Sequence, residues 1–486
     1  MPPMTDELLG HQRSERQKRI VELFDRVAPS RDEWIKRNAF YYEDDRNFMR
    51  FLIPEGLSIL ELGCGTGELL SKLSPSRGIG IDISPKMIEA AREKHPEFEF
   101  HVGDIEIQSI LEKLDGPFDI IILSDTLGLL EDCQETLTNI HHLCNNHSRL
   151  IVAYYSHLWE PILNLADRFG AKMPQPKHNW LSSQDIVSLL DLADFEVVKR
   201  EWRQLLPKRL LGLGTLINRY IAPLPLIRNL CLRNYVVARS LTKKSLVKPS
   251  VSVIVPCRNE KGNIAPAIER LPRLCDDLET IFIEGHSSEG TYEEALRVKD
   301  AHPDLDIKVL KQDGTGKGDA VRKGFDAARG DVLMILDADL TVSPEDLPKF
   351  YRAIAEGKGE FINGSRLVYP MQEQAMRFLN FWANQAFSVV FSYLLNQRFT
   401  DTLCGTKVLT REAYERIARD REYFGNFDPF GDFDLIFGAA KQNLKIIEIP
   451  VRYGSRSYGS TQISRFIHGW LLLKMVVFAF RKLKAL

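Results

Sequence analysis

The sequence predicts an α/β protein of two domains, each built on a mainly parallel sheet. Residues 57–73 and 251–271 begin with the same pattern, in which an aliphatic strand is followed by a turn of small residues and a helix. After each stretch, strand patterns alternate with helical ones, as in sheets covered by helices. The length of 486 residues is enough for two large domains or about three of average size.

The composition is that of an ordinary globular protein, with 44% hydrophobic and 27% charged residues. The formal net charge of −2 gives no reason to expect a nucleic-acid partner. Seven scattered cysteines without a CxxC pair favour a reducing compartment. The polar N-terminus lacks the apolar core of a signal peptide, so we expect a cytoplasmic protein.

A polar, basic stretch that ends in Pro-Ser separates the two halves at 242–250. We therefore expect a first domain at 1–240, a linker at 241–250 and a second domain at 251–486. No sequence repeat relates the two domains beyond their shared architecture.

In the first half, a predicted strand runs into a glycine-rich turn with Gly63, Gly65 and Gly67 at every second position. These glycines let the backbone turn tightly and approach a ligand. A lone motif of this kind would also fit a dinucleotide. The next strand, about 20 residues on, ends in Asp82, where a carboxylate can accept both ribose hydroxyls. A third strand ends in Asp104, and a fourth covers 118–125.

This ordered series resembles class I S-adenosylmethionine-dependent methyltransferases over about 35–200. The resemblance implies a Rossmann-like fold and S-adenosyl-L-methionine as cofactor. It places Glu61, Gly63 and Gly65 around the methionine end, Asp82 on the ribose and Asp104 near the adenine. A dinucleotide-dependent enzyme is the alternative, but the sequence lacks a substrate-domain motif for one.

The methyl acceptor is not identified by the sequence. Candidate bases or substrate contacts follow the fourth and fifth strands, at the sheet edge where α/β proteins bind ligands. They are Ser124, Asp125, Tyr154, Tyr155 and His157. Methyl transfer needs mainly alignment, so oxygen, nitrogen and carbon acceptors all stay open.

In the second half, the strand 332–336 runs into Asp337 and Asp339. Two carboxylates one residue apart at a strand end can hold a hard divalent cation. Such a cation would neutralise a diphosphate and stabilise it as a leaving group.

Together with the stretches 316–324 and 328–331, this motif looks like family 2 glycosyltransferases of the GT-A fold. Within the family the chain most resembles dolichol- or polyprenyl-phosphate sugar transferases, through 363–366, 401–407 and 448–451. The likeness covers about 250–470. It implies a nucleotide-sugar donor, a polyprenyl-phosphate acceptor, and Mg²⁺ or Mn²⁺ held by Asp337 and Asp339. The residues that it places at the substrates are Pro256, Arg258, Asn259, Glu260, Glu284, Lys317 and Arg366.

One departure from the family pattern concerns the end of the second strand of this half. The family usually has two aspartates there, whereas this chain has Glu284 and Gly285. Glu284 can still contact a base, but the missing acid leaves uridine and guanosine open as the donor nucleotide.

The acceptor side is predicted near Asp432 and Asp434, which with Asp339 are the candidate catalytic residues. A hydroxyl acceptor would need a base there, because an alcohol is a poor nucleophile at neutral pH. A phosphate acceptor is already anionic and would not. Arg452 and Arg456 offer guanidinium groups suited to phosphates.

Two basic, apolar segments predict contact with a membrane surface. Residues 202–259 and 449–486 contain 11 and 7 Lys or Arg and no Asp or Glu. Within the second half, 378–397 and 466–482 have the composition of amphipathic, interfacial helices. The alternative is that both helices pack on their domain. We expect a peripheral protein on the cytosolic face of a membrane.

The sequence as a whole predicts a bifunctional enzyme of glycolipid or surface-glycan synthesis. A metal-dependent, inverting transferase would move a hexose to a polyprenyl phosphate, and a methyltransferase would act on an unidentified acceptor. Two alternatives stay open. The transferase acts on a sugar hydroxyl in polysaccharide assembly, or the first half is only a binding or regulatory module.

Overall fold

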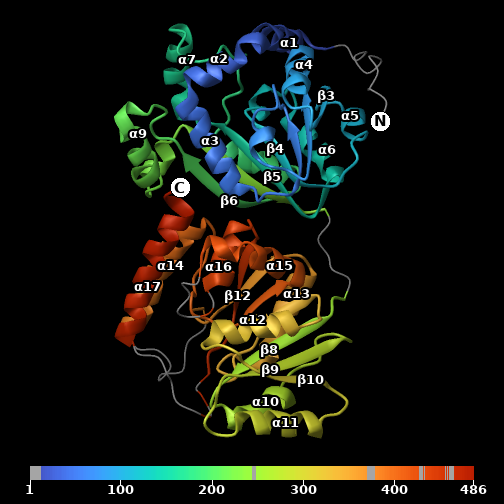
Figure 1. Ribbon diagram of the computed structural model, residues 1–486, viewed down its shortest axis with the longest axis vertical. Coiled ribbons are helices and arrows are strands. Elements are labelled where there is room, and N and C mark those ends of the chain that lie inside the picture. Colours follow the sequence, from blue (N-terminus) through green and yellow to red (C-terminus); the bar gives the residue numbers. More distant parts are fainter. Residues whose placement is uncertain are drawn as a thin grey trace. The chain divides into compact units, whose positions relative to one another are not determined.

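The computed structural model describes residues 13–242, 248–368, 378–425, 431, 433–454, 456, 458 and 465–486, with only the backbone described for 378–384 and 465–469. The chain divides into two compact units, Met1–Lys243 with Lys484–Leu486, and Lys244–Leu483. Among the described residues, each unit contains a seven-stranded sheet with helices against it (Figure 1). The predicted class, two α/β domains, is confirmed.

The sheet of the first unit has the strand order β3-β2-β1-β4-β5-β7-β6. The first five strands pair in parallel, and β7 runs antiparallel to both neighbours. Leu60 lies opposite Ile79 on one side and Ile121 on the other, within an almost solvent-free core. The strands are β1 Ser58–Leu62, β2 Arg77–Asp82, β3 Glu99–Val102, β4 Phe118–Ser124, β5 Cys144–Tyr155, β6 Phe195–Arg203 and β7 Arg233–Ser240.

Two helices that border the candidate site begin at side-chain caps. Ser14 and Gln17 form a capping box at the start of α1, and the Ser84 side chain caps α4 ahead of Pro85. The helices are α1 Glu15–Val27, α2 Arg31–Arg37, α3 Ala39–Leu52, α4 Pro85–Lys94, α5 Gln108–Leu111, α6 Cys133–Asn139, α7 Glu160–Arg168, α8 Ser183–Leu192 and α9 Leu213–Leu216.

The sheet of the second unit has the order β10-β9-β8-β11-β13-β12-β14, with β13 antiparallel to both neighbours and the other pairs parallel. Its strands are β8 Val251–Cys257, β9 Leu278–Glu284, β10 Asp306–Lys311, β11 Val332–Ile335, β12 Phe361–Ser365, β13 Lys407–Thr410 and β14 Ile446–Pro450.

Helix α12 (Lys317–Ala327) packs closely on this sheet, since a Cβ on Gly324 would lie 2.5 Å from Ile254. The close packing fixes the N-terminus of α12 near the strand ends. The other helices are α10 Ile264–Glu269, α11 Thr291–Ala301, α13 Leu347–Ala355, α14 Phe378–Leu395, α15 Arg411–Arg419, α16 Phe433–Lys441 and α17 Arg465–Ala479.

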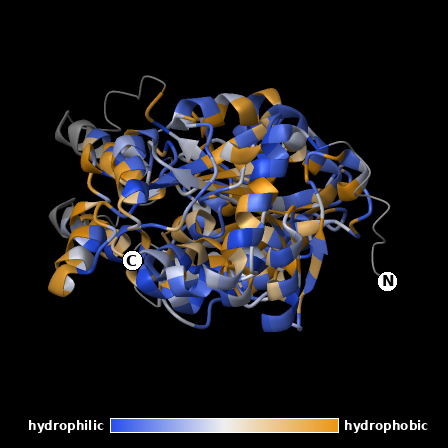
Figure 2. Ribbon diagram, turned by 90° about the horizontal axis from the view of Figure 1, so that it is seen from above, coloured by the Kyte–Doolittle hydropathy of each residue, from blue (hydrophilic) through white to orange (hydrophobic). Residues whose placement is uncertain are grey.

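The stretches expected to be interfacial form α14 and α17. Two polar residues of α14 face the protein, because Ser388 is buried and the Ser392 hydroxyl donates to the Phe399 carbonyl (3.2 Å). In α17, Trp470, Leu473 and Val477 are exposed. Figure 2 shows hydrophobic residues on peripheral helices as well as in the interior. Within the described part of the chain, every helix is too short or too polar to cross a bilayer.

Candidate functional site

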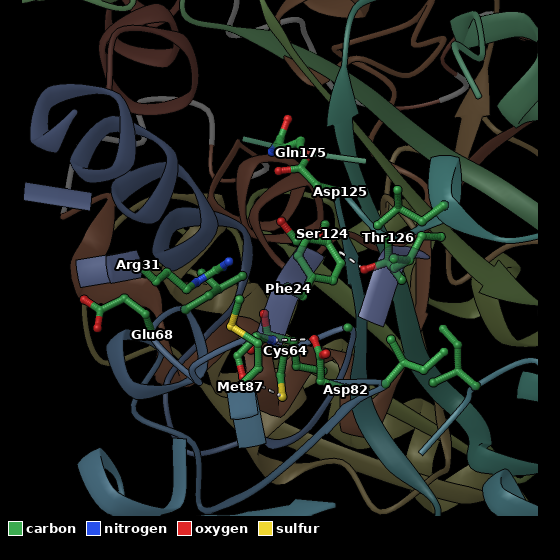
Figure 3. A pocket seen from close by; sticks show the side chains of 18 of the residues that line it. Phe24, Arg31, Cys64, Glu68, Asp82, Met87, Ser124, Asp125, Thr126 and Gln175 are labelled. Carbon is green, nitrogen blue, oxygen red and sulfur yellow. Dashed lines mark hydrogen bonds between the residues drawn. The ribbon is translucent and has the colours of Figure 1, made fainter. Parts of the chain in front are cut away.

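A pocket in the first unit lies at the carboxyl ends of β1, β2, β3 and β4. All five residues predicted at the cofactor line it: Glu61, Gly63, Gly65, Asp82 and Asp104. Figure 3 shows Arg31 and Glu68 on one side of this pocket and Asp125 with Gln175 at one end. Four strand ends meet here because parallel strands end at the same edge of a sheet.

The glycine turn leaves no room for side chains. Gly63 has φ +84°, and a Cβ there would lie 2.2 Å from Thr126 Oγ1. Thr126 is held in place because its hydroxyl donates to the Leu62 carbonyl (2.9 Å). Gly65 has φ +54°, and a Cβ there would lie 2.9 Å from the Arg31 guanidinium. The turn therefore presents bare backbone to the pocket.

Asp82 is oriented by backbone donors at the end of β2. Its Oδ2 accepts from the Gly65 N–H (2.8 Å) and its Oδ1 from the Ser84 N–H (2.9 Å). Burial nevertheless raises its pKa above the ordinary value. This geometry ties the ribose-binding candidate to the glycine turn.

Glu61 is a buried acid with an unused oxygen. It is 3% exposed, and its Oε2 has no hydrogen-bond partner. Burial raises its pKa to about 8, against an ordinary 4.5. An unpartnered acceptor beside the turn fits the cationic methionine end of S-adenosylmethionine, which would favour the charged form.

Arg31, at the start of α2, is a pocket residue that the sequence reasoning missed. Its guanidinium lies against Gly65, and its Nε is buried without a partner. A cation beside the glycine turn could pair with the carboxylate of a bound amino acid. Residue 31 precedes the first strand, so no motif marked it.

The other acid predicted at the cofactor is contacted by helix α1. The Gln17 amide donates to Asp104 Oδ2 (2.8 Å) and to Glu106 Oε2 (3.2 Å). Asp104 Oδ1 accepts from the Glu106 N–H (3.0 Å). Gln17 therefore donates to the carboxylate that was expected near an adenine amino group.

A buried ionic and aromatic network forms the far end of the pocket. The fully buried Arg233 pairs with Asp45 (Nε to Oδ1, 3.1 Å) and with Asp125. Its guanidinium lies 5.0 Å from the ring centre of Tyr155. The Tyr41 hydroxyl donates to the Tyr155 hydroxyl (3.1 Å). Arg233, Asp45 and Tyr41 were not predicted from the sequence.

The acceptor candidates separate into two groups. Ser124, Asp125 and Tyr155 line the pocket, whereas Tyr154 and His157 do not. His178, which was not predicted, also lines the pocket, and burial lowers its pKa to about 4. Its imidazole is therefore neutral at pH 7.

In the second unit, β11 is followed by Asp337, whose Oδ1 lies 2.6 Å from Lys317 Nζ at the start of α12. Burial opposes ionisation, but Lys317 outweighs it and holds the pKa of Asp337 below its ordinary value. A Cβ on Gly405 would lie 1.9 Å from Asp337 Oδ2 and 2.5 Å from Lys317 Nζ. The loop before β13 therefore closes tightly over this ion pair.

Asp339 is bound by a second cation. Arg456 Nη2 lies 2.7 Å from its Oδ2, and Thr341 donates to Oδ1 from its N–H (3.1 Å) and its hydroxyl (2.8 Å). The Gly454 N–H donates to the Thr341 carbonyl (2.9 Å), which places the loop after β14 beside β11. The structure thus brings Lys317, Asp337, Asp339 and Arg456 to one edge of the sheet.

The loops after β8 and β9 interlock at the same edge. Glu284 accepts from the Ser287 N–H, and the Ser287 hydroxyl accepts from the Asn259 N–H (2.9 Å). Burial raises the pKa of Glu260, and Asp339 adds to the effect. Pro256, near the end of β8, is half-buried, and Arg258, in the loop after it, is exposed.

Other predicted residues of this unit have protein partners or lie apart. Arg366 forms a bidentate pair with Asp401, with both N–O distances 2.7 Å. Asp434 lies 3.4 Å from Arg322 Nη1 and 3.6 Å from Arg421 Nε. Arg452 is exposed, and Asp432 lies outside the described residues.

Asp337 and Asp339 would supply only part of the ligands that a metal ion needs. Over the described ranges, no group of three or more His, Cys, Asp or Glu side chains is placed to hold a metal ion. Two carboxylates suit Mg²⁺ or Mn²⁺ when phosphate oxygens and water supply the remaining ligands.

These two sites define the class of the protein. Residues 53–206 match the family described as "Methyltransferase domain", and residues 252–418 match "Glycosyl transferase family 2". The chain therefore combines a methyltransferase domain with a family 2 glycosyltransferase domain.

Among curated proteins, the chain is similar to the low-salt glycan biosynthesis hexosyltransferase Agl6 of Haloferax volcanii, at 27% identity over 47% of this chain and 54% of that protein. It is similar to the dolichol-phosphate mannosyltransferase of Pyrococcus furiosus, at 28% identity over 44% of this chain and 59% of that protein. The polyprenol monophosphomannose synthase of Mycolicibacterium smegmatis matches at 25% identity, over 44% of this chain and 80% of that protein. The chain thus spans a little over half the length of the first two relatives.

Proposed function

We propose that residues 251–486 transfer a hexose from a nucleotide sugar to a polyprenyl phosphate, and that residues 1–240 transfer a methyl group from S-adenosylmethionine. The proposed hexose transfer rests on one observation, the alternating charges at the end of β11. They belong to Lys317, Asp337, Asp339 and Arg456. Relatives named as a dolichol-phosphate mannosyltransferase and a polyprenol monophosphomannose synthase support the acceptor class.

The donor site would bind the nucleotide with the loops after β8 and β9 and the diphosphate beside Asp337. Lys317 would stabilise the negative charge that develops on the leaving diphosphate. Asp337 and Asp339 would hold Mg²⁺ or Mn²⁺, which supplies further charge neutralisation there. Arg456 would exchange its carboxylate partner for a phosphate when the donor binds.

The surroundings of Asp434 favour a phosphate acceptor over a sugar hydroxyl. Its carboxylate lies close to Arg322 and Arg421 and is 9% exposed. The two guanidinium groups engage this carboxylate as an ion-pair partner, a role in which it does not have to accept a proton. A phosphate acceptor is already anionic, so the transfer needs no base at this position.

A polyprenyl-phosphate acceptor implies work at a membrane surface. Trp470, Leu473 and Val477 of α17 are 60%, 50% and 60% exposed, at the spacing of one helix face. Lys474 is also exposed between them. This face has the chemistry of an interfacial helix, which supports peripheral association.

For the methyltransferase half, the residues fit S-adenosylmethionine through their unused polar groups. Glu61 and Arg31 would hold the methionine end, and Asp82 the ribose. Ser124 and Tyr155 lie at the far end, where an acceptor would be aligned with the methyl group. A binding module without turnover would keep the first set of contacts and need no acceptor.

The test is incubation of the purified full chain with membranes and labelled UDP- or GDP-sugars, followed by lipid extraction. Label is expected in the lipid phase with one of the two nucleotides, and only when Mg²⁺ or Mn²⁺ is present. If neither donor labels lipid, the polyprenyl-phosphate acceptor is wrong. Calorimetry with S-adenosylmethionine tests the other half, where the absence of binding would contradict the cofactor assignment.

A further inference from the structure

The first unit exposes many large apolar side chains in two segments. Leu211 and Leu226 are 109% and 84% exposed. Soluble proteins scatter such side chains singly, and a contiguous set marks an interaction surface. The exposed residues are Leu158, Ile162, Leu165 and Phe169 around α7, and Leu210, Leu211, Leu213, Leu216, Tyr220, Ile221, Leu224, Leu226 and Leu230 farther along the chain.

Helix α7 has an apolar face that is exposed in the described part of the chain. None of its residues is buried, although it is amphipathic. Ile162 and Leu165 fall on one side of the helix at 100° per residue, together with Phe169 just after it, and Glu160 and Asp167 fall on the opposite side. The apolar side therefore points to solvent in a helix that could have buried it.

The two segments adjoin one another. The Trp159 indole N–H donates to the Leu230 carbonyl (2.8 Å), and the Ser156 N–H donates to the Leu232 carbonyl (2.8 Å). In Figure 1, α7 and α9 lie on the same side of the first unit. The exposed apolar residues of 158–169 and 210–230 together form one surface, the docking surface.

The charges of this surface indicate its partner. Residues 204–232 contain no Asp or Glu. Lys208, Arg209 and Arg219 are exposed among the leucines. Aliphatic and aromatic side chains flanked by lysine and arginine suit an anionic lipid surface. The leucines contact the acyl chains, and the basic side chains pair with the anionic head groups. We infer that the first unit docks on an anionic membrane through the docking surface.

The docking surface adjoins the pocket. The Gln204 amide donates to the Tyr41 carbonyl (2.6 Å), and Lys208 Nζ donates to Asn38 Oδ1 (2.9 Å). Tyr41 lines the pocket. Docking would therefore bring the methyltransferase pocket to the bilayer. The inference rests on the proposed function only for the presence of a membrane in the reaction.

Two substitutions test the surface at exposed positions. Leu211 has φ +58° and ψ +26°, in the left-handed region that Asn adopts more readily than Leu, whereas Leu226 has φ +70° and ψ −49°, outside that region. Both side chains are exposed, so Leu211→Asn with Leu226→Asn should fold, and thermal melting of the double variant checks this. Leu192→Asn is the matched control, because Leu192 is 63% exposed in the same unit but lies outside both segments.

The measurement is co-sedimentation of the full chain with phosphatidylglycerol–phosphatidylcholine vesicles, combined with hydrogen exchange. Removing two leucines should weaken binding about tenfold or more, whereas the control binds as the parent does. High salt should weaken binding further. Vesicles should slow exchange in 158–169 and 208–230.

Three outcomes would overturn the inference. They are equal vesicle binding by the double variant and the parent, unchanged exchange in both segments, or a parent dimer that the double variant abolishes. Lipid labelling by a nucleotide sugar is measured separately. A chain that binds vesicles through this surface but labels no lipid would contradict the proposed transfer and leave the docking surface intact.

Discussion

Lys317 Nζ lies 2.6 Å from Asp337 Oδ1, at the point where the first turn of α12 faces the end of β11. The pair joins the stretch 316–324 to the carboxylates after β11, two motifs that are separate in the sequence. It also places a cation where the proposed reaction releases a diphosphate.

Lys317→Gln should lower the rate of sugar transfer by roughly 100-fold, because it removes the positive charge that would stabilise the leaving diphosphate. Lys323→Gln is the control, since Lys323 belongs to the same helix but pairs with the exposed Asp313. Initial rates over a range of donor concentrations would measure the effect. Equal rates for both variants would remove Lys317 from the donor site.

Gly405→Ala should abolish transfer, because its Cβ would lie 1.9 Å from Asp337 Oδ2. Gly425→Ala is a demanding control, since Gly425 has φ +70° and open space around it. The control therefore suffers backbone strain without a clash. Thermal melting should show both variants folded, and only Gly405→Ala should lose activity. Full activity of Gly405→Ala would contradict this account of the loop.

Glu61→Gln should make the cofactor-free protein more stable and weaken cofactor binding. The pKa of Glu61 is about 8 in the folded state, against 4.5 ordinarily. The unfolded chain therefore releases this proton at lower pH, and stability falls as pH rises from 4.5 to 8. At pH 7 the raised pKa lowers the free energy of unfolding by about 3 kcal/mol. Denaturant melts should show a clearly larger gain at pH 7 than at pH 5, where the loss is only about 1 kcal/mol.

Binding of S-adenosylmethionine at pH 7 should also release a proton from Glu61, because the cationic ligand favours the carboxylate. Calorimetry in buffers of different ionisation enthalpy measures that proton. An unchanged proton count in Glu61→Gln would assign the release to another group.

Arg31→Gln should weaken S-adenosylmethionine binding by about tenfold or more, through the loss of a charge-assisted contact to the methionine carboxylate. Arg37→Gln is the control from the same helix, since Arg37 stacks on Trp34 instead of lining the pocket. Isothermal titration of both variants gives the comparison. S-adenosylhomocysteine should show the same loss, because it carries the same carboxylate.

Asp434→Asn should distinguish the two acceptor classes. With a phosphate acceptor the rate should stay within about tenfold of the parent, whereas loss of a required base would cost roughly 100- to 10,000-fold. The variant leaves Arg322 and Arg421 without their carboxylate, so its melting temperature must be measured alongside. A large loss of rate in a folded variant would favour a sugar hydroxyl as acceptor.

Strand periodicity and the residues at strand ends were enough to predict the two sheets and the acids at their edges. The two sheets and the positions of Glu61, Asp82, Asp337 and Asp339 at their edges follow from local patterns. Those patterns work because parallel strands bring their carboxyl ends together.

Contacts made by distant segments were beyond the sequence. Arg31 precedes the first strand and reaches Gly65 only through the path of α1 and α2, and Arg233 meets Asp45 across 188 residues. Arg366 belongs to a motif that was expected to contact the substrates. In the structure its guanidinium forms a bidentate ion pair with the buried Asp401. Spacing along the chain carries no information on such pairs.

Helix α1 has a kinetic consequence for the methyltransferase. Arg16 donates to the carbonyls of Leu130 (3.1 Å) and Gly128 (3.2 Å), while Gln17 holds Asp104. Under the proposed function, an adenine amino group that donates to Asp104 Oδ2 would compete with the Gln17 amide for that oxygen. Release of the spent cofactor would then depend on how fast the first helix opens, and turnover would be slow even where methyl transfer itself is fast.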